Sequence, residues 1–374
     1  MRGEGLVLDR AAIAGVAVRF FLMGMLIAAY GPLVEVLSHR FALSVPVAGT
    51  PISVSFAGSL VGVFGGMWAL GRAPARLPVT VATAVAAVGV TAVALAPTWP
   101  LFLVSVFVTG TGFGVLVLAL NQVVAYTEGR RRAALLNALN SCYSIGAVAG
   151  PLLVALLARG HFTALYLVAA AAWLAVIPTG LGISGRLPVG SAPWRSPGVL
   201  VGVFVCGFLL YVAIENGIGG WMTTHLVASG LDLRAAATFT SGFWIALVAG
   251  RLLMTLVPPA VSEAKIVLAA SALAAGALLC GAFAPLAPYA YLAAGFAMAP
   301  IFPTAVVWLA RLRPGDARAT SWVYPASAIG GVVGPGAIGV VIAGAGVGWA
   351  PAVLGSVAAV MVAAFWLAAR RSRA

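Results

Sequence analysis

The sequence predicts an all-α integral membrane protein with twelve transmembrane helices in two pseudo-symmetric six-helix bundles. Hydrophobic residues make up 63% of the 374-residue chain and charged residues only 8%. The apolar residues form about twelve runs, each near the ~20 residues that an α-helix needs to cross a bilayer. Only about 31 residues are then available for each helix and its connection, so the chain has no room for a soluble domain.

The basic residues lie between the apolar runs, and their density alternates along the chain. Sixteen of them fall at the two ends and in every second connection, whereas the other connections hold only Arg40, Arg159 and Arg234. Cytoplasmic connections of membrane proteins are enriched in Lys and Arg, so both termini are expected to be cytoplasmic. This topology also accounts for the net charge of +13, and we expect no nucleic-acid partner.

The predicted spans divide into two sets of six around one Gly-, Pro- and Ser-rich stretch. The first six lie near residues 11–37, 46–70, 78–97, 99–126, 133–158 and 163–184. The last six lie near residues 198–227, 235–257, 265–284, 286–310, 317–343 and 347–369. Residues 185–197 are the candidate cytoplasmic linker between an N-terminal bundle, 1–184, and a C-terminal bundle, 198–374. The first apolar run is expected to be a retained helix and not a cleaved signal peptide.

An internal repeat supports two equivalent halves. The stretch Ser144–Pro151 in the fifth span matches Ala328–Pro335 in the eleventh, 184 residues further on. The stretch Val61–Gly66 in the second span aligns with Ala246–Arg251 in the eighth, at an offset of 185 residues. Two nearly equal offsets at corresponding helices indicate a parallel duplication of a six-helix unit. A duplicated chain of this kind is expected to work as a monomer around its own central cavity.

The twelve spans, the duplication and several local motifs together resemble the major facilitator superfamily of secondary transporters. The motifs are similar to those of its fucose-permease-like branch of sugar:proton symporters: Phe20-Phe21, Leu136-Asn137, Ser144–Pro151, Tyr211–Trp221, Trp244 through Gly250-Arg251, and Ala299–Thr304. The resemblance implies a transporter, not an enzyme, that moves a small polar, sugar-like solute by alternating access. The arginine-rich composition with a single lysine favours a multi-pass protein of a bacterial inner membrane.

The chain departs from this family where the family's acidic residues stand. Alignment on the motifs places Gly31 and Val117 where fucose permeases carry their binding and proton-coupling acids. Trp68 stands at the position of an Asp that usually precedes the Gly71-Arg72 pair. Neither the proton site nor the gating ion-pair network of the family is therefore carried over. Proton-coupled symport and facilitated diffusion both remain open.

Glu215 is the acid that the sequence places well inside a span. The other seven acids lie at predicted helix ends or in connections, and an acid at mid-bilayer costs about 2.5–3.5 kcal/mol on insertion scales. Two hypotheses follow: Glu215 binds a proton or a polar solute, or it is a structural acid bonded to a neighbouring helix or a basic partner. Glu215, Asn216 and Arg19 are the candidates for proton coupling or gating. Arg251, near a predicted cytoplasmic helix end, is expected to be structural and to snorkel to the interface.

A sugar site needs amides and hydroxyls for hydroxyl groups, and aromatic faces for the apolar side of the ring. Asn137, Asn140 and Tyr143 share one face of the fifth span, and the family resemblance supports Asn140 and Tyr143 as cavity-lining. The alternative for each aromatic residue is packing or a place in the interfacial belt. The candidate substrate-binding residues are Asn121, Gln122, Asn137, Asn140, Tyr143, Tyr211, Trp244, Phe302, Trp322 and Tyr324.

Other function classes have weaker signals. The stretch Gly146–Pro151 partly resembles the motif of drug or metabolite efflux antiporters, which form the alternative function, but the glycines that should follow are missing. The sequence shows no cluster of catalytic residue types, no nucleotide-binding loop and no pattern typical of a symmetric channel. We therefore expect no catalytic residue and no cofactor. No metal site is expected either, because the cysteines and histidines are scattered: Cys142, Cys206, Cys280, His39, His161 and His225.

Overall fold

Long apolar helices dominate the molecule, because backbone N–H and C=O groups in lipid must be satisfied within the chain. The computed structural model describes residues 6–126, 132–186, 198–254, 261–313 and 322–372. These residues contain twelve helical segments that are long and apolar enough to cross a membrane. The predicted all-α membrane fold with twelve spans is confirmed. The cytoplasmic placement of the termini stays a prediction.

The first six spans follow one another through short connections. Their elements are β1 (Val7–Leu8), α1 (Arg10–Phe41), α2 (Val45–Ala48), α3 (Thr50–Leu70), α4 (Arg76–Leu95), α5 (Trp99–Tyr126), α6 (Arg132–Leu153), the π-helical η1 (Val154–Ala158), α7 (Arg159–Val176), the 3₁₀ helix η2 (Ile177–Gly182) and β2 (Ile183–Ser184). Strands β1 and β2 pair antiparallel, so the start of α1 is tied to the end of the sixth span.

The last six spans have the same general plan. Their elements are α8 (Val199–Ala228), α9 (Leu233–Leu253), α10 (Glu263–Cys280), the 3₁₀ helix η4 (Ala284–Leu286), α11 (Ala287–Met298), α12 (Ile301–Leu312), α14 (Val323–Ala345), the 3₁₀ helix η5 (Val347–Trp349) and α15 (Ala350–Arg371). The predicted linker, 185–197, lies almost entirely outside the described residues.

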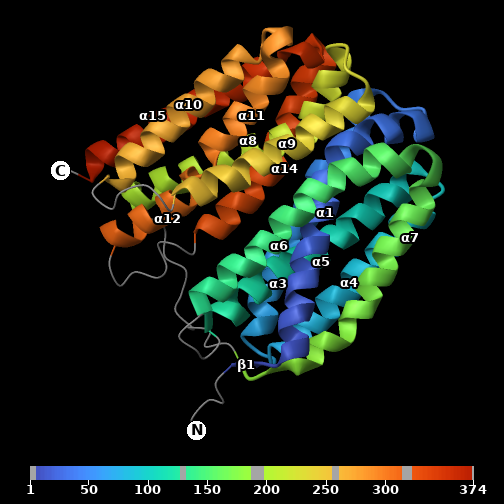
Figure 1. Ribbon diagram of the computed structural model, residues 1–374. Helices are drawn as coiled ribbons and strands as arrows, with labels where there is room; N and C mark the ends of the chain where they lie inside the picture. Colours follow the sequence, from blue (N-terminus) through green and yellow to red (C-terminus); the bar gives the residue numbers. More distant parts are fainter. Residues whose placement is uncertain (1–5, 127–131, 187–197, 255–260, 314–321, 373–374) are drawn as a thin grey trace. The chain divides into compact units, whose positions relative to one another are not determined.

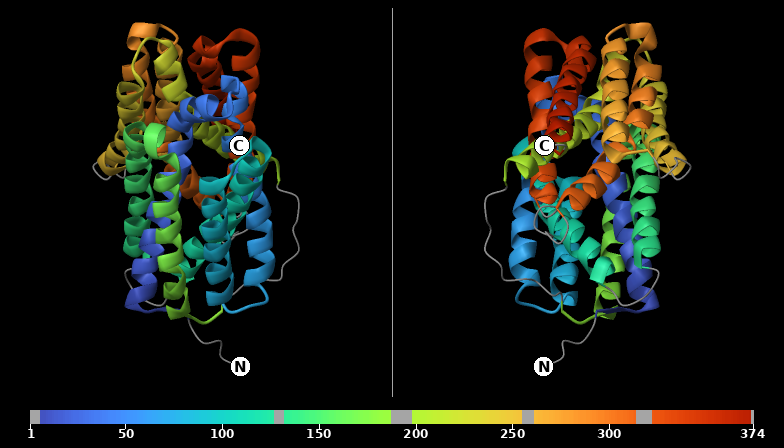
Figure 2. Two further views of the ribbon diagram at one scale, coloured as in Figure 1. Left: turned by 90° about the vertical axis from the view of Figure 1, so that its right-hand side faces the viewer. Right: turned by 90° about the vertical axis from the view of Figure 1, so that its left-hand side faces the viewer.

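The helices gather into two compact units (Figures 1 and 2). One comprises Met1–Ala29 and Val54–Pro193, and the other comprises Tyr30–Ser53 and Trp194–Ala374. The segment Tyr30–Ser53 belongs to the first six spans in sequence, yet it packs with the last six. The division of the sequence into domains 1–184 and 198–374 stays a prediction.

The two copies of the repeated glycine motif make the same kind of contact. In the first unit a Cβ atom on Gly146 would overlap the carbonyl oxygen of Phe21, so α6 lies backbone-to-backbone against α1. In the second unit a Cβ atom on Gly330 would overlap the carbonyl oxygen of Leu209, so α14 lies in the same way against α8. Gly150 and Gly334, one turn further, repeat the contact in each unit. Small residues four apart permit this approach in membrane helices.

The tenth span is interrupted, which the sequence-based boundaries 286–310 did not anticipate. Helix α11 ends at Met298 and α12 begins at Ile301. Pro300 and Pro303 explain the interruption, because proline has no N–H with which to continue the hydrogen-bond ladder of α11. The carbonyl oxygen of Phe296, which would otherwise accept from residue 300, accepts instead from the N–H of Ala299 at 3.4 Å.

Candidate functional site

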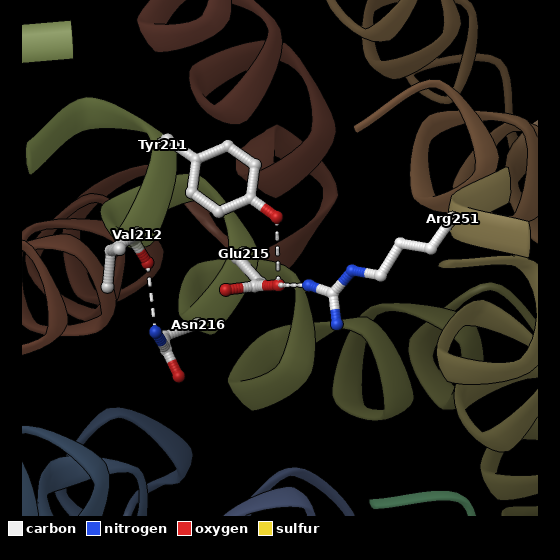
Figure 3. Close-up of polar contacts among 5 residues, drawn as sticks. All are labelled: Tyr211, Val212, Glu215, Asn216 and Arg251. Carbon is white, nitrogen blue, oxygen red and sulfur yellow. Dashed lines mark hydrogen bonds and ion pairs between the residues drawn. The ribbon is translucent and has the colours of Figure 1, made fainter. Parts of the chain in front are cut away.

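Glu215 lies in the middle of α8, the first helix of the second half. It is the seventeenth of the 30 residues of α8, about 24 Å from the start of a helix about 45 Å long. One turn earlier on the same face, the Tyr211 hydroxyl donates a hydrogen bond of 3.0 Å to Oε1 of Glu215 (Figure 3). Tyr211 is buried, so its hydroxyl is held in place by this bond.

Arg251 reaches the same carboxylate oxygen from the neighbouring helix α9. Its Nη2 lies 3.8 Å from Oε1 of Glu215 (Figure 3). This distance is an ion-pair contact but is longer than a hydrogen bond. Within the described residues, Oε2 of Glu215 has no hydrogen-bond partner, and the Arg251 guanidinium, which also faces the Tyr211 hydroxyl, keeps unused N–H groups. The site therefore pairs an acid and a base while leaving hydrogen-bonding capacity on both.

The interruption of the tenth span lies beside this pair. A Cβ atom on Gly250 would lie 2.6 Å from the carbonyl oxygen of Phe296 and 2.6 Å from Cβ of Ala299, so α9 is in close contact with the end of α11 next to Arg251. On the other side of the interruption, the Phe302 ring lies 5.7 Å from the ring of Tyr211, centroid to centroid. In membrane transporters, solute and ion sites commonly lie at such discontinuous helices.

Trp244 on α9 adds a hydrogen-bond donor near Gly219, which lies one turn after Glu215 on α8. Its indole contacts Gly219, where a Cβ atom would lie 3.2 Å from Cζ2 of the Trp244 ring. Trp244 is only 6% exposed, and within the described residues its indole N–H has no hydrogen-bond partner. A buried polar group without a partner is uncommon in proteins, so this N–H is a candidate contact for a solute.

The structure does not bring every predicted residue of the second half to this cluster. Asn216 donates a hydrogen bond of 3.0 Å to Val212 on its own helix, and it lies on the side of Glu215 opposite to Arg251 (Figure 3). Trp322 stands directly before α14. Tyr324 lies in α14, but its side chain is outside the described residues.

The candidates of the first half lie on α5 and α6. The side-chain amide of Asn121 donates a hydrogen bond of 2.7 Å to Val117 on its own helix, which leaves its oxygen available as an acceptor. Gln122 follows it, and both are partly exposed. Tyr143 on α6 is also partly exposed. The side chains of Asn137 and Asn140 lie outside the described residues, so the proposed amide face of the fifth span stays a prediction.

Arg19 is fully buried between α1, α4 and the end of α7. Its Nε donates to the Thr83 hydroxyl at 2.8 Å, and its Nη1 donates to the Thr179 hydroxyl at 2.9 Å. Its Nη2 donates to the carbonyl oxygen of Val176 at 2.8 Å. All three guanidinium nitrogens are thus engaged by neutral groups. These contacts favour a structural role over the predicted role in gating.

Sequence reasoning missed Arg251 as a functional candidate. It placed Arg251 near a cytoplasmic helix end and Glu215 well inside its span, so the two were not expected to meet. An arginine side chain spans several ångströms, and this reach closes the difference in depth. One signal in the sequence could have found it: charged residues inside membranes commonly have a partner of opposite charge, and Arg251 is a basic residue inside a neighbouring span.

Comparison with protein-family models gives one match, to a model described as Major Facilitator Superfamily, over residues 16–294. This range covers well over half of the chain. A comparison with curated proteins found no match.

Solved structures of membrane transporters share the fold at low sequence identity. A POT family transporter in complex with a thioalcohol-conjugated peptide has a TM-score of 0.79 and 15% identity, covering 97% of this chain and 96% of that one. A D-xylose–proton symporter has a TM-score of 0.75 and 14% identity, covering 95% and 97%. A bacterial homologue of the human lysosomal transporter Spinster has a TM-score of 0.75 and 14% identity, covering 96% of each chain. Identities this low establish the fold alone.

Proposed function

Because the chain belongs to the major facilitator superfamily, we propose that it moves a small polar solute by alternating access and that Glu215 is its proton-binding group. Membership makes the chain a multi-pass membrane transporter. The identity of the solute, the coupling to protons and the direction of transport are the proposed part. The predicted monomeric state and bacterial inner-membrane location also belong to this proposal.

The observation that carries the proposal is the pair of Glu215 on α8 and Arg251 on α9, which are in ionic contact but leave hydrogen-bonding groups unused. A charged pair within the membrane is costly, and intramembrane charges mark solute and proton pathways. A purely structural pair is expected to form short, complete hydrogen bonds, because incomplete ones do not offset the cost of burying charge. The contact of 3.8 Å and the unpartnered Oε2 support a pair that changes partners during transport.

Proton binding at Glu215 has a direct physical consequence. The protonated carboxyl is neutral, so its attraction to Arg251 is largely lost and the guanidinium becomes available to another partner. The two states of the pair differ in charge and in contacts, which is what a coupling ion needs in order to shift a conformational equilibrium. The missing acids at Gly31 and Val117 do not then exclude proton coupling, because Glu215 would supply it from the second half.

The solute class is less constrained than the fold. The resemblance to the fucose-permease-like branch implies a sugar-like solute, and this stays a prediction. The solved structures of the same fold include a D-xylose–proton symporter, a POT family transporter with a bound peptide conjugate and a nucleoside transporter, so the likeness favours no one solute class. The antiporter alternative also remains, since uptake and efflux use the same fold.

Counterflow in proteoliposomes tests the proposal. Purified protein is reconstituted, and exchange is measured across a panel of sugars, polyols, cationic dyes and small organic acids. At least one solute is expected to exchange, and an imposed pH gradient is expected to drive its accumulation. Glu215→Gln is expected to keep the exchange and to lose the response to pH. An unchanged pH response in this variant would remove Glu215 as the proton carrier and leave the structural hypothesis.

A further inference from the structure

We propose, resting on the function proposed above, that the solute carries a carboxylate and that Arg251 binds this carboxylate once Glu215 has taken up a proton. The solute and the proton then cross the membrane together. The proposal names the chemistry of the solute, a small organic anion, and assigns Arg251 as the residue that selects it.

Glu215 does not use the full hydrogen-bonding geometry of the Arg251 guanidinium. Arginine binds a carboxylate best through two parallel N–H···O bonds of about 2.7–2.9 Å. Glu215 offers only Oε1, at 3.8 Å, and that oxygen already accepts a bond from Tyr211. The Arg251 side chain is 39% exposed and has unused N–H groups within the described residues. A mobile carboxylate could therefore bind Arg251 more completely than Glu215 does.

The net charge of the Glu215–Arg251 site also favours binding an anion together with a proton. With Glu215 ionised, the pair with Arg251 is neutral, and an anionic solute would add an uncompensated charge inside the membrane, which is costly. Protonation of Glu215 leaves Arg251 as the single positive charge, and a bound carboxylate restores neutrality. The loaded state holds one proton and one anion, and the empty state holds neither. Both states are neutral at this site, so transport is expected to be electroneutral.

Among the described residues, no charged side chain other than Arg251 contacts Glu215. Glu215 contacts two ionisable side chains, Tyr211 and Arg251. The other ionisable side chains described on α8, on residues 30–41 of α1 and on the other elements packed against α8 make no contact with Glu215: Tyr30, Glu35, His39, Arg40, Cys206, His225, Asp232, Arg234, Tyr289, Tyr291, Arg311, Arg370 and Arg371. A proton bound at Glu215 therefore acts on Arg251 directly.

The rest of the solute would find neutral and apolar partners. The buried indole N–H of Trp244 is an unpartnered donor within the described residues, and its ring packs against Gly219, one turn from Glu215 on α8. The half-buried ring of Phe302 offers apolar surface beside the interruption of the tenth span. Such a site fits a small organic acid with one further polar group better than a polyhydroxylated sugar, which would need several neutral amides.

The experiment uses the full-length protein in proteoliposomes with matched probes. Labelled lactate is compared with lactamide, which has nearly the same size but no carboxylate, and with xylose; pyruvate, benzoate and gluconate extend the carboxylate set. Lactate uptake is expected to rise when the outside is acidic. It is also expected to be unaffected by a valinomycin-imposed membrane potential. Protein-free liposomes measure the passive diffusion of the undissociated acid.

Three variants separate the roles of the pair. Arg251→Gln is expected to raise the KM for lactate at least about tenfold, as loss of one charge-assisted contact does, and Arg251→Lys is expected to recover part of this loss. Glu215→Gln mimics the protonated carboxyl, so it is expected to exchange lactate at pH 7.5 as wild type does at low pH. A misfolded protein could not produce that gain. The matched control is Arg234→Gln, which changes an exposed arginine of α9, the helix that carries Arg251.

The outcomes distinguish this inference from the function on which it rests. Exchange of xylose or lactamide without exchange of any carboxylate would overturn the carboxylate assignment and leave the transporter proposal intact. Carboxylate uptake that responds to membrane potential would overturn electroneutral coupling. Failure of every solute in both panels to exchange would defeat the two proposals together.

Discussion

At the scale of single residues, Arg19 shows how the first unit holds a buried charge without an acid. Its guanidinium donates to two threonine hydroxyls and to the carbonyl oxygen of Val176, the last residue of α7. The last carbonyl groups of a helix carry partial negative charge, so the end of α7 takes the place of a carboxylate. Arg19 thereby joins α1, α4 and the sixth span at one point. This placement explains why a charge in an apolar span need not belong to a solute site.

Replacing Arg19 with lysine tests that assignment. Lysine keeps the charge but cannot reach three acceptors in three directions, so Arg19→Lys is expected to lower the free energy of unfolding by at least about 2 kcal/mol. The measurement is a thermal melt of the purified protein in detergent, followed by size-exclusion chromatography. Arg10→Lys, at the exposed first residue of α1, is the control. Unchanged melting together with lost transport would instead assign Arg19 to the transport cycle.

At the scale of helices, the repeated glycines set the distance between α8 and α14. Alanine stabilises a helix relative to glycine by about 1 kcal/mol, but a Cβ atom on Gly330 would overlap the backbone of Leu209. Overpacking of this kind costs about 1–3 kcal/mol, so Gly330→Ala is expected to lower the melting temperature. Gly344→Ala, on the same helix with no atom within 4 Å of the added Cβ, is expected to leave it unchanged or to raise it. Equal effects of the two changes would contradict the close contact.

The segment Tyr30–Ser53 is the second feature at this scale. Gly31 lies against the backbone of Gly219, and the ring of Trp221 lies against Gly49. The Trp221 indole also donates a hydrogen bond of 2.8 Å to Pro335. The segment is covalently part of the first six spans, yet these contacts hold it against α8 and α14 of its own unit.

Gly31→Leu is expected to loosen this segment. The larger side chain cannot fit against Gly219, and a destabilisation of about 1.4–2.8 kcal/mol would raise hydrogen exchange about 10- to 100-fold. Hydrogen–deuterium exchange followed by mass spectrometry would detect the change in peptides covering residues 45–53. Gly65→Leu, at an open position of α3, serves as the matched control. Unaltered exchange in residues 45–53 would mean that the Gly31 contact does not hold the segment.

At the scale of the whole molecule, the fold was predictable and the site was predictable only in part. Span number follows from apolar run length, and the duplicated glycine motif, read as a sign of duplication, lies at the matching α6–α1 and α14–α8 contacts. Glu215 stood out because it is an acid inside an apolar run. Its partner Arg251 is 36 residues away, and the pairing depends on how α9 packs against α8 and on the reach of one side chain. The interruption at Pro300 was not predicted, although Pro300 and Pro303 are its signal in the sequence, and nothing in the sequence indicated its position beside Glu215.

The orientation of the chain in the membrane is the remaining prediction at this scale. Trp68 stacks with Arg72 at 4.7 Å and Trp366 with Arg370 at 3.7 Å, measured from the guanidinium carbon to the ring centroid. Both pairs occur at ends of spans where the arginine distribution predicts the cytoplasm. Aromatic and basic residues together are typical of the membrane interface. Trp68 thus occupies the position of the family's Asp with a contact to Arg72 instead of the expected gating ion pair.

Labelling of single cysteines in intact cells tests this orientation. The background lacks Cys142, Cys206 and Cys280. Ala228→Cys stands at the last residue of α8, next to the connection to α9, and Val261→Cys stands in the connection before α10; both positions are exposed. A membrane-impermeant maleimide is expected to label the cysteine at 228 in intact cells and the cysteine at 261 only after permeabilisation. Successive connections must lie on opposite sides of the membrane, so the reverse pattern would invert all twelve spans. It would also show that the arginine-rich connections do not set the orientation of this chain.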